Sequence, residues 1–319
     1  MSKHSSSVRS AFGEAVDRWQ CLVLQTFDQE IVEKQLCHHT REHVAAVRQR
    51  ARRMFEAVRP YLQSSGESDR LALLLDLCAT AHDLVQVFTP QIGPHKARQR
   101  EPGISEAATI ERLFQLIESE NRQNSLSTDQ FTSADRELVR EAIMATVCAY
   151  DSTEDAVYQP ALYQPGKPVS PIARILALAD IGSLGMEGID AYNREGSLLF
   201  LEENPDARAL QEKGELSNLA DANAELAENI RQRLLRRARF QVSFARSRLK
   251  RGPEELRGLP SAALPALTDD LFARLTPETL RELESTTPVG EAVPFEVLVN
   301  FFRFDQNVGP QIVSVDISQ

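Results

Sequence analysis

The segment that decides the fold is CATAHDLVQVF, residues 78 to 88, where a histidine and an aspartate stand side by side in an apolar run. Residues 71 to 88 have the apolar spacing of a helix and contain no Lys, Arg or Glu. The polar residues of this helix recur at spacings of three, four and seven and so gather toward one side of it: Asp76, Thr80, His82, Asp83 and Gln86.

This polar stripe has two interpretations. It is the solvated face of an amphipathic helix, or it is a set of buried groups that share a partner. Water-facing helix surfaces usually carry long charged side chains, whereas these side chains are short and include metal-ligand types. Because a buried carboxylate is costly unless a charge or hydrogen bonds compensate it, the second interpretation predicts a metal site.

Two further predicted helices place an ionisable residue beside an apolar face. Asp180 ends the apolar segment PIARILALADI and is either a ligand or a C-terminal turn residue before Gly182. His43 borders the apolar stripe of a helix predicted from 40 to 59 and is either a ligand or a hydrogen-bonded core histidine. Two histidines and two aspartates suit one divalent ion, Mn, Fe, Co, Ni, Zn or Mg. We therefore expect His43, His82, Asp83 and Asp180 to converge on one point.

The composition is that of an ordinary globular protein: 42% of the 319 residues are apolar and 26% are charged. The net charge of −10 gives no electrostatic case for nucleic acid or an acidic membrane. Four scattered cysteines indicate free thiols, the N-terminal residues lack the apolar core of a signal peptide, and no apolar run reaches the length of a membrane span. We expect a cytoplasmic protein without membrane or nucleic-acid partners, and the sequence leaves its oligomeric state open.

Helical periodicity dominates the chain and predicts an all-α fold. The interval from 206 to 251 fits one long helix or a hairpin of two helices, ended by Gly252-Pro253. The segment FEVLVNFFRF, residues 295 to 304, fits a strand or a helix. The other predicted helices span about 69–88, 104–120, 171–181 and a segment from 133, with loops at 90–103 and 151–169.

The order of these motifs resembles the HD-domain superfamily of metal-dependent phosphohydrolases. The matching pieces are TREHVAAV with His43, CATAHDLVQ with His82 and Asp83, and ILALADIGSLG with Asp180. The resemblance covers roughly residues 37 to 200. It implies a helical core that holds one metal by those four residues and hydrolyses a phosphate ester, often of a nucleotide. It divides the chain into an N-terminal helical segment (1–36), an HD-type domain (37–204) and a C-terminal helical extension (205–319).

The sequence departs from the family pattern beside the His-Asp pair. Many single-metal members carry an acidic residue three positions after the pair, where this chain has Gln86, which cannot exchange a proton. Two-metal members use further histidines, but only His95 lies in that interval and Thr146 stands where another is expected, which disfavours a binuclear site. Glu106 is the candidate replacement for the acidic residue; the alternative is a carboxylate that favours the first turn of its helix.

Several residues near the pair are candidates for contact with substrate phosphate. They lie at Gln86 and in the loop that follows it, and the alternative for the loop cations is an ordinary solvated position. These candidates are Gln86, Lys96, Arg98 and Arg100.

Residues 231 to 251 form a basic helix with nine Arg or Lys and no acidic residue. Its apolar face, which includes Leu235 and Val242, predicts packing on the core, with the arginines solvated or paired to upstream carboxylates such as Glu225. The alternatives are a clamp for substrate phosphate, a nucleic-acid contact or a partner surface.

We expect a metal-dependent phosphohydrolase that acts on a nucleotide or another small phosphate ester. Asp83 is a ligand that also orients the attacking water, and Glu106 is the candidate acid or base. The alternative is an HD fold kept as a signalling or ligand-binding module that binds metal or nucleotide with little or no turnover, a function that Gln86 favours.

Overall fold

The computed structural model describes residues 11–62, 65–93, 95–123, 131–164 and 166–304. The predicted all-α class is confirmed, since the described residues are mostly helical and hold a two-stranded hairpin as their sheet. None of their helices is long and apolar enough to cross a membrane. The elements are α1 (Ala11–Lys34), α2 (Arg41–Val58), η1 (Arg59–Tyr61), α3 (Ser65–Ala81), α4 (Ile104–Gln123), α5 (Ser133–Met144), β1 (Ala149–Asp151), β2 (Ala156–Tyr158), η3 (Pro160–Tyr163), α6 (Pro171–Asp180), α7 (Ser183–Met186), α8 (Ile189–Glu203), α9 (Pro205–Glu212), η4 (Leu216–Asn218), α10 (Leu219–Ala222), α11 (Ala224–Leu256), η5 (Ser261–Ala263), the π-helical turn η6 (Ala266–Leu271), α12 (Pro277–Thr286) and α13 (Phe295–Phe302).

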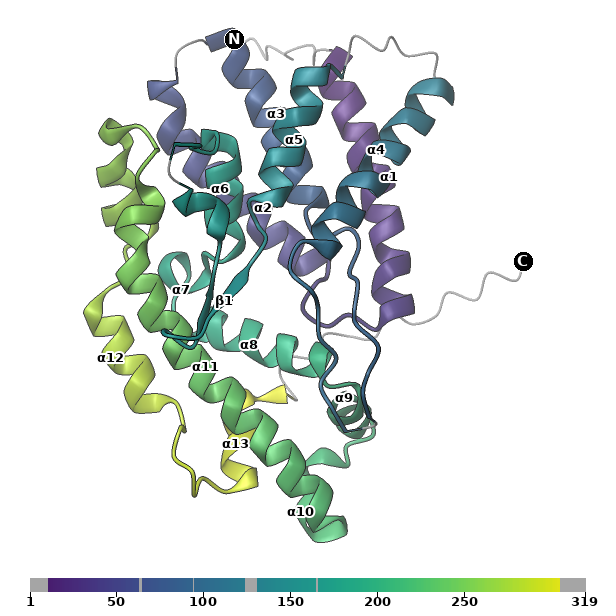
Figure 1. The fold of residues 1–319 in the computed structure, drawn as a ribbon, viewed down its shortest axis with the longest axis vertical. Coiled ribbons are helices and arrows are strands. Elements are labelled where there is room, and N and C mark those ends of the chain that lie inside the picture. Colours follow the sequence, from purple (N-terminus) through teal and green to yellow (C-terminus); the bar gives the residue numbers. More distant parts are fainter. Residues whose placement is uncertain (1–10, 63–64, 94, 124–130, 165, 305–319) are drawn as a thin grey trace, which may run out of the picture.

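Two large apolar cores and a smaller cluster of Leu184, Tyr192, Ala245 and Leu283 hold these helices together. Figure 1 shows the helices of one large core above those of the other. In the upper core, α2 and α3 pack against each other, against α6 and, through α3, against α1 and α5. In the lower core, α8, α11 and α13 bury Phe200, Leu234 and Leu298. Residues from both sides of position 204 contribute to both cores, so packing does not separate the predicted domain from its extension.

Local sequence signals explain where several helices begin. Ser170 caps α6 by accepting a hydrogen bond from the backbone N–H of Ala173, and Pro171 occupies the first turn, as predicted. Thr132 and Asp135 form a reciprocal capping box at α5. These caps fix the start of the two helices that pack against each other in the upper core.

The predicted helix 69–88 is corrected, because α3 ends at Ala81. Beyond that point, hydroxyl groups of α4 replace the helical acceptors: Val85 N–H donates to Thr109 Oγ1 and Val87 N–H donates to Ser105 Oγ, each at 3.0 Å. Leu84 remains buried although it lies past the end of the helix, which explains why the apolar run of the sequence extends beyond Ala81. His82 and Asp83 therefore lie just after a helix end rather than inside a helix.

The predictions for 206–251 are also corrected. Gly214 adopts the left-handed φ of +69° just after α9 ends. Asn223 separates α10 from α11 and caps α11 by accepting a hydrogen bond from the backbone N–H of Leu226. Helix α11 does not end at Gly252-Pro253 but continues to Leu256. Pro253 removes only one hydrogen bond near the end, and the buried Glu255 holds the last turn by accepting hydrogen bonds from Arg248 and Tyr163.

Two segments left open or called loops acquire structure. FEVLVNFFRF begins as helix α13, packed in the lower core through Leu298. The proline-rich interval 151–169 contributes to the antiparallel hairpin β1–β2, which pairs Ala149 with Tyr158. Figure 1 shows this hairpin reaching down from the upper helices toward α11, and the loop after α3 reaching down to α9.

Candidate metal centre

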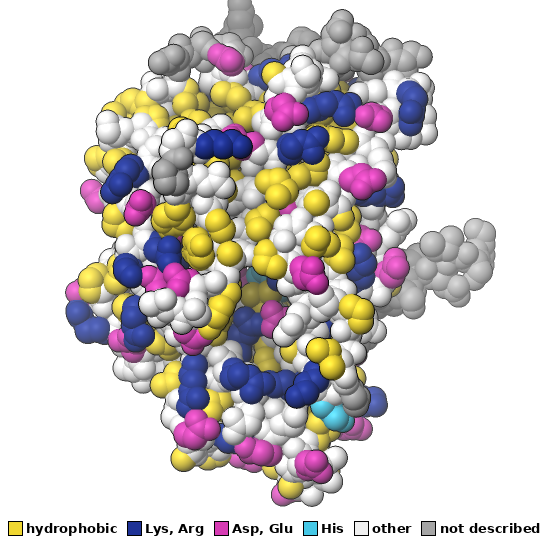
Figure 2. All heavy atoms as spheres, viewed as in Figure 1, with side chains coloured by type: hydrophobic (Ala, Val, Ile, Leu, Met, Phe, Trp, Pro, Cys, Tyr) yellow, Lys and Arg dark blue, Asp and Glu magenta, His cyan; other side chains and the backbone are white. Residues whose placement is uncertain are grey.

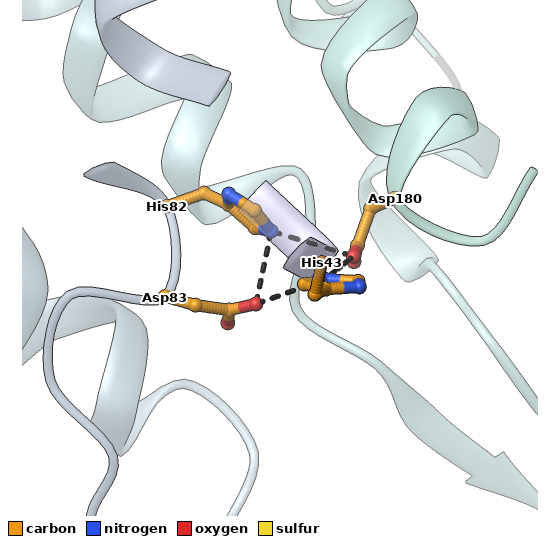
Figure 3. Close-up of side chains that lie close together, drawn as sticks. All are labelled: His43, His82, Asp83 and Asp180. Atoms are coloured by element: carbon orange, nitrogen blue, oxygen red, sulfur yellow. Dashed lines mark ion pairs between the residues drawn. The ribbon is translucent and has the colours of Figure 1, made fainter. Parts of the chain in front are cut away.

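The four residues of the predicted metal site come together. His43 lies in the first turn of α2, His82 and Asp83 directly follow α3, and Asp180 is the last residue of α6. One candidate ligand atom from each lies within 4.8 Å of all the others (Figure 3). The prediction that these side chains converge on one point is confirmed.

The contacts within the cluster join imidazole nitrogens to carboxylate oxygens. His43 Nε2 lies 3.3 Å from Asp83 Oδ2 and 3.3 Å from Asp180 Oδ1. His82 Nε2 lies 2.9 Å and 3.5 Å from the same two oxygens. Both Nε2 atoms are buried, and neither has a hydrogen-bond partner among the described residues. Both nitrogens instead face the two carboxylate oxygens in ion-pair contact, an arrangement that four ligands of one shared cation would also have.

The histidines of the cluster favour the charged form of the aspartates, and the aspartates favour the charged form of the histidines. Burial lowers the pKa of His43, but Asp180 and Asp83 outweigh it and raise that pKa to about 9. The same carboxylates raise the pKa of the buried His82 well above its ordinary value. Burial raises the pKa of Asp83 and of Asp180, yet the histidines hold both carboxyls below their usual range. The carboxylates thus favour positive charge at this point, and a divalent cation would compete with the two imidazole protons for it.

Neighbouring groups orient two of the four residues. His82 Nδ1 lies 3.0 Å from the carbonyl oxygen of Ala79, which selects the tautomer with a free lone pair on Nε2. Gln86 Nε2 donates to Asp83 Oδ1 at 3.0 Å, and Arg100 donates to Gln86 Oε1 at 2.7 Å. Gln86, which was predicted to contact substrate, thus holds one oxygen of Asp83, while the other oxygen, Oδ2, faces the histidines.

The donor set fits a transition-metal ion. Two imidazole nitrogens and two carboxylate oxygens are ligand types of Mn, Fe, Co, Ni and Zn. Mg is less suited, because it prefers oxygen ligands and retains several waters. The imidazoles are buried, whereas the side chains of Asp83 and Asp180 keep 17% and 18% exposure toward a cavity that both residues line. A substrate would therefore approach from the carboxylate side.

His39 and Glu202 belong to this neighbourhood, although the sequence did not single them out. His39 Nε2 lies 3.8 Å from Asp83 Oδ2, and its Nδ1 lies 2.5 Å from Glu202 Oε1. The other oxygen of Glu202 accepts the backbone N–H groups of Cys37, His38 and His39. The only sequence signal was the His-His pair before Thr40, which lies in a linker without periodicity, and Glu202 is 163 residues from His39.

The cluster opens into a cavity of about 600 Å³, which Figure 2 shows as a hollow near the centre of the face. Glu106, in the first turn of α4, lines it, and burial together with the nearby aspartates raises its pKa above the ordinary value. Arg98 and Arg100 also line the cavity. Lys96 is exposed and does not line it.

The guanidinium of Arg98 is already hydrogen-bonded to other groups of the protein. It donates to the backbone carbonyls of Lys34, Gln35 and Glu202 and lies over the ring of Phe88. Arg100 is more exposed and reaches Gln86 and His39 Nε2. Of the two predicted cationic phosphate contacts on the cavity wall, Arg100 is the one bonded to Gln86, which in turn bonds Asp83 of the four-residue cluster.

The basic helix, now within α11, packs as predicted and also faces the cavity. Leu235 and Val242 are buried. Arg233 pairs with Asp206 and Arg237 with Glu203, rather than with the expected Glu225. Three arginines of this helix also line the cavity that reaches the cluster: Arg233, Arg236 and Arg237. Their role as a clamp for substrate phosphate stays a prediction.

No family model, curated protein or solved structure matches this chain.

Proposed function

We propose that this chain is a metal-dependent phosphohydrolase of the HD superfamily that acts on a small phosphate ester such as a nucleotide. The observation that carries the proposal is the convergence of two buried imidazole nitrogens and two carboxylates at the wall of a ligand-sized cavity. The ordered motifs TREHVAAV, CATAHDLVQ and ILALADIGSLG support the same assignment.

His43 Nε2, His82 Nε2, Asp83 Oδ2 and Asp180 Oδ1 would hold the ion. When bound, a divalent cation supplies Lewis acidity, which acidifies water and stabilises charge on a phosphoryl group. Asp83 faces this point with one oxygen while Gln86 fixes the other, so the carboxylate is positioned before substrate arrives.

Two further side chains suit phosphate ester cleavage. Glu106 faces the cavity with a raised pKa, so it retains a proton to higher pH than an exposed glutamate and can protonate a leaving-group oxygen. Arg100 brings a guanidinium to the same wall, held by Gln86, and can orient a phosphoryl oxygen.

A second function is favoured by Gln86. Its amide is bonded on both sides, to Asp83 and to Arg100, and cannot exchange a proton. A protein with this arrangement binds metal and ligand without rapid turnover if Glu106 does not act as the acid.

Hydrolysis assays separate the two functions. We expect the protein with Mn, Co or Ni to release p-nitrophenol from p-nitrophenyl phosphate or phosphate from members of a nucleotide panel. Asp180→Asn should lower this rate by more than about 100-fold, since even residues that only support metal ligands cost 10- to 100-fold. Asp190→Asn, an exposed carboxylate in the first turn of α8, is the matched control and should keep the rate.

The outcomes are distinct. Metal uptake without product would favour the binding module. Failure of the wild-type protein to take up any of these metals would contradict the phosphohydrolase, and failure to bind nucleotide as well would contradict the binding module.

A further inference from the structure

Two chemically different groups of residues line the cavity. Asp83, Asp180 and Glu106 contribute carboxylates, whereas α11 contributes Arg233, Arg236, Arg237 and Phe240. Figure 2 shows Lys or Arg side chains gathered directly below the hollow. The four α11 residues follow the spacing i, i+3, i+4 and i+7, so they occupy one side of the helix.

Four of the five arginines that line this cavity are hydrogen-bonded or ion-paired within the protein. Arg98 is bonded to three carbonyl groups, and Arg100 to Gln86 and His39. Arg233 pairs with Asp206 and also donates to Asn204. Arg237 pairs with Glu203.

Arg236 is the exception. Among the described residues it has no hydrogen bond and no ion pair, although it lines the cavity. Its neighbours one turn away on α11 are Gln232, Arg233, Arg239 and Phe240, so no carboxylate of its own helix lies within reach at i±3 or i±4. The neighbouring Arg233, Arg237 and Arg239 are paired with Asp206, Glu203 and Glu291, so Arg236 is left as an exposed guanidinium without a counter-charge among the described residues.

Five arginines and five carboxylates line the cavity, so their formal charges cancel. A divalent cation at the four-residue cluster would add two positive charges, and one phosphate carries about two negative charges and would balance them. A second anionic group is therefore indicated locally, because Arg236 lines the same cavity and has no counter-charge among the described residues.

We propose that Arg236 anchors a second anionic group of the substrate, remote from the phosphate held at the four-residue cluster. The substrate class is then an organic phosphate with two separate anionic groups, joined by a part that lies along Phe240 and Tyr150, whose rings also line the cavity. This inference rests on the proposed function for the position of the first phosphate, and it makes Arg236 a specificity residue that does not touch the reacting atoms.

Binding of two nucleotides tests this assignment without requiring turnover. The probes are adenosine 5′-monophosphate and adenosine 3′,5′-bisphosphate, measured by calorimetry on the full chain with Mn present. We expect the wild-type protein to bind the bisphosphate about tenfold more tightly, as a charge-assisted contact would give. Arg236→Ala should abolish this preference and leave monophosphate affinity within about twofold.

Arg239→Ala is the matched control. It removes the same charge from the same helix, but Arg239 pairs with Glu291 and does not line the cavity. The control should keep the tenfold preference at about 0.05 M and at about 0.3 M salt, whereas a general field effect would be screened at the higher value. Equal losses in the two variants, or no preference in the wild-type protein, would overturn the assignment.

Hydrolysis of p-nitrophenyl phosphate, which has one anionic group, separates this proposal from the proposed function. Activity on that ester without a bisphosphate preference would reject the Arg236 anchor and keep the phosphohydrolase. An Arg236-dependent preference without any product would keep the anchor and reject the phosphohydrolase.

Discussion

Glu106 takes its chemical character from its surroundings. It lies in the first turn of α4, where the helix dipole favours a carboxylate, yet burial and the charges of Asp83 and Asp180 raise its pKa. The sequence offered both interpretations, a helix-start carboxylate and a catalytic group. The structure is compatible with both interpretations, because the same side chain lies in the first turn of the helix and lines the cavity beside the four-residue cluster.

The pH dependence of catalysis tests Glu106. A general acid must be protonated, so kcat/KM should fall as pH rises through the raised pKa of Glu106. Glu106→Gln should lower kcat/KM by about 10²- to 10⁴-fold and remove that alkaline decline. Glu111→Gln, on the exposed side of the same helix, should keep the wild-type profile. If Glu106→Gln kept the same fall in kcat/KM at alkaline pH, that fall would come from another titrating group.

The metal residues were predictable from sequence because short polar side chains in apolar helices are anomalous wherever they occur. His43, Asp83 and Asp180 each carried that signal on their own helix. His39 and Glu202 did not, because a histidine in a linker and a glutamate near a helix end are ordinary in isolation. Their relation to Asp83 exists only after distant segments fold together.

Asp76, a residue of the polar stripe of α3 that lies away from the metal residues, connects α3 to two other helices. Its carboxylate accepts from Gln20 on α1 and from Arg48 and Arg52 on α2, at distances of 2.7 to 3.1 Å. Neither sequence interpretation, a solvated face or a metal site, describes this residue. It joins three helices, and the arginines that compensate it could not be chosen without knowing how α2 packs.

Acid titration tests this junction. Burial raises the pKa of Asp76, but Arg48 and Arg52 outweigh it and hold the pKa below its ordinary value. A carboxyl with a depressed folded-state pKa stabilises the protein above the unfolded pKa of about 4, and this contribution disappears as pH falls through the folded value. Asp76→Ala should cost about 2 to 4 kcal/mol at pH 7, measured by urea unfolding, and progressively less below about pH 4.

Asp69→Ala provides the comparison. Asp69 pairs with Arg59 but its side chain is 72% exposed, so the change should cost less than about 1 kcal/mol. A cost for Asp76→Ala that does not shrink on acidification would mean that lost packing, rather than charge pairing, explains it.

For the whole molecule, helical periodicity predicted the all-α fold class, but it did not predict where several helices end or how they surround the cavity. The three helix corrections arise where tertiary contacts override local pattern: α4 hydroxyls end α3, Gly214 breaks the chain after α9, and Glu255 holds α11 past Pro253. The cavity could not be predicted either, since α11 reaches it from a segment more than 50 residues beyond Asp180.

Metal removal tests the assembled centre. A ligand that binds only the folded chain stabilises it by about 2.7 kcal/mol at 100 times its Kd, so Mn should raise the melting temperature and EDTA should reverse the rise. Because metal requires neutral imidazole and the pKa of His43 is raised to about 9, the rise should grow as pH increases toward that value. Asp83→Ala should abolish it and Asp190→Asn should keep it; equal melting temperatures with and without metal would argue against a bound ion.

The Glu202 carboxylate has a consequence for local motion. A linker between two helices ordinarily exchanges its amide hydrogens with solvent early, because few hydrogen bonds resist local opening. Here one oxygen accepts three consecutive amides, those of Cys37, His38 and His39, from a helix far along the chain. Opening this linker requires breaking its hydrogen bonds to Glu202 of α8, so we expect the amide hydrogens of residues 37 to 39 to exchange as slowly as those of the helices beside them.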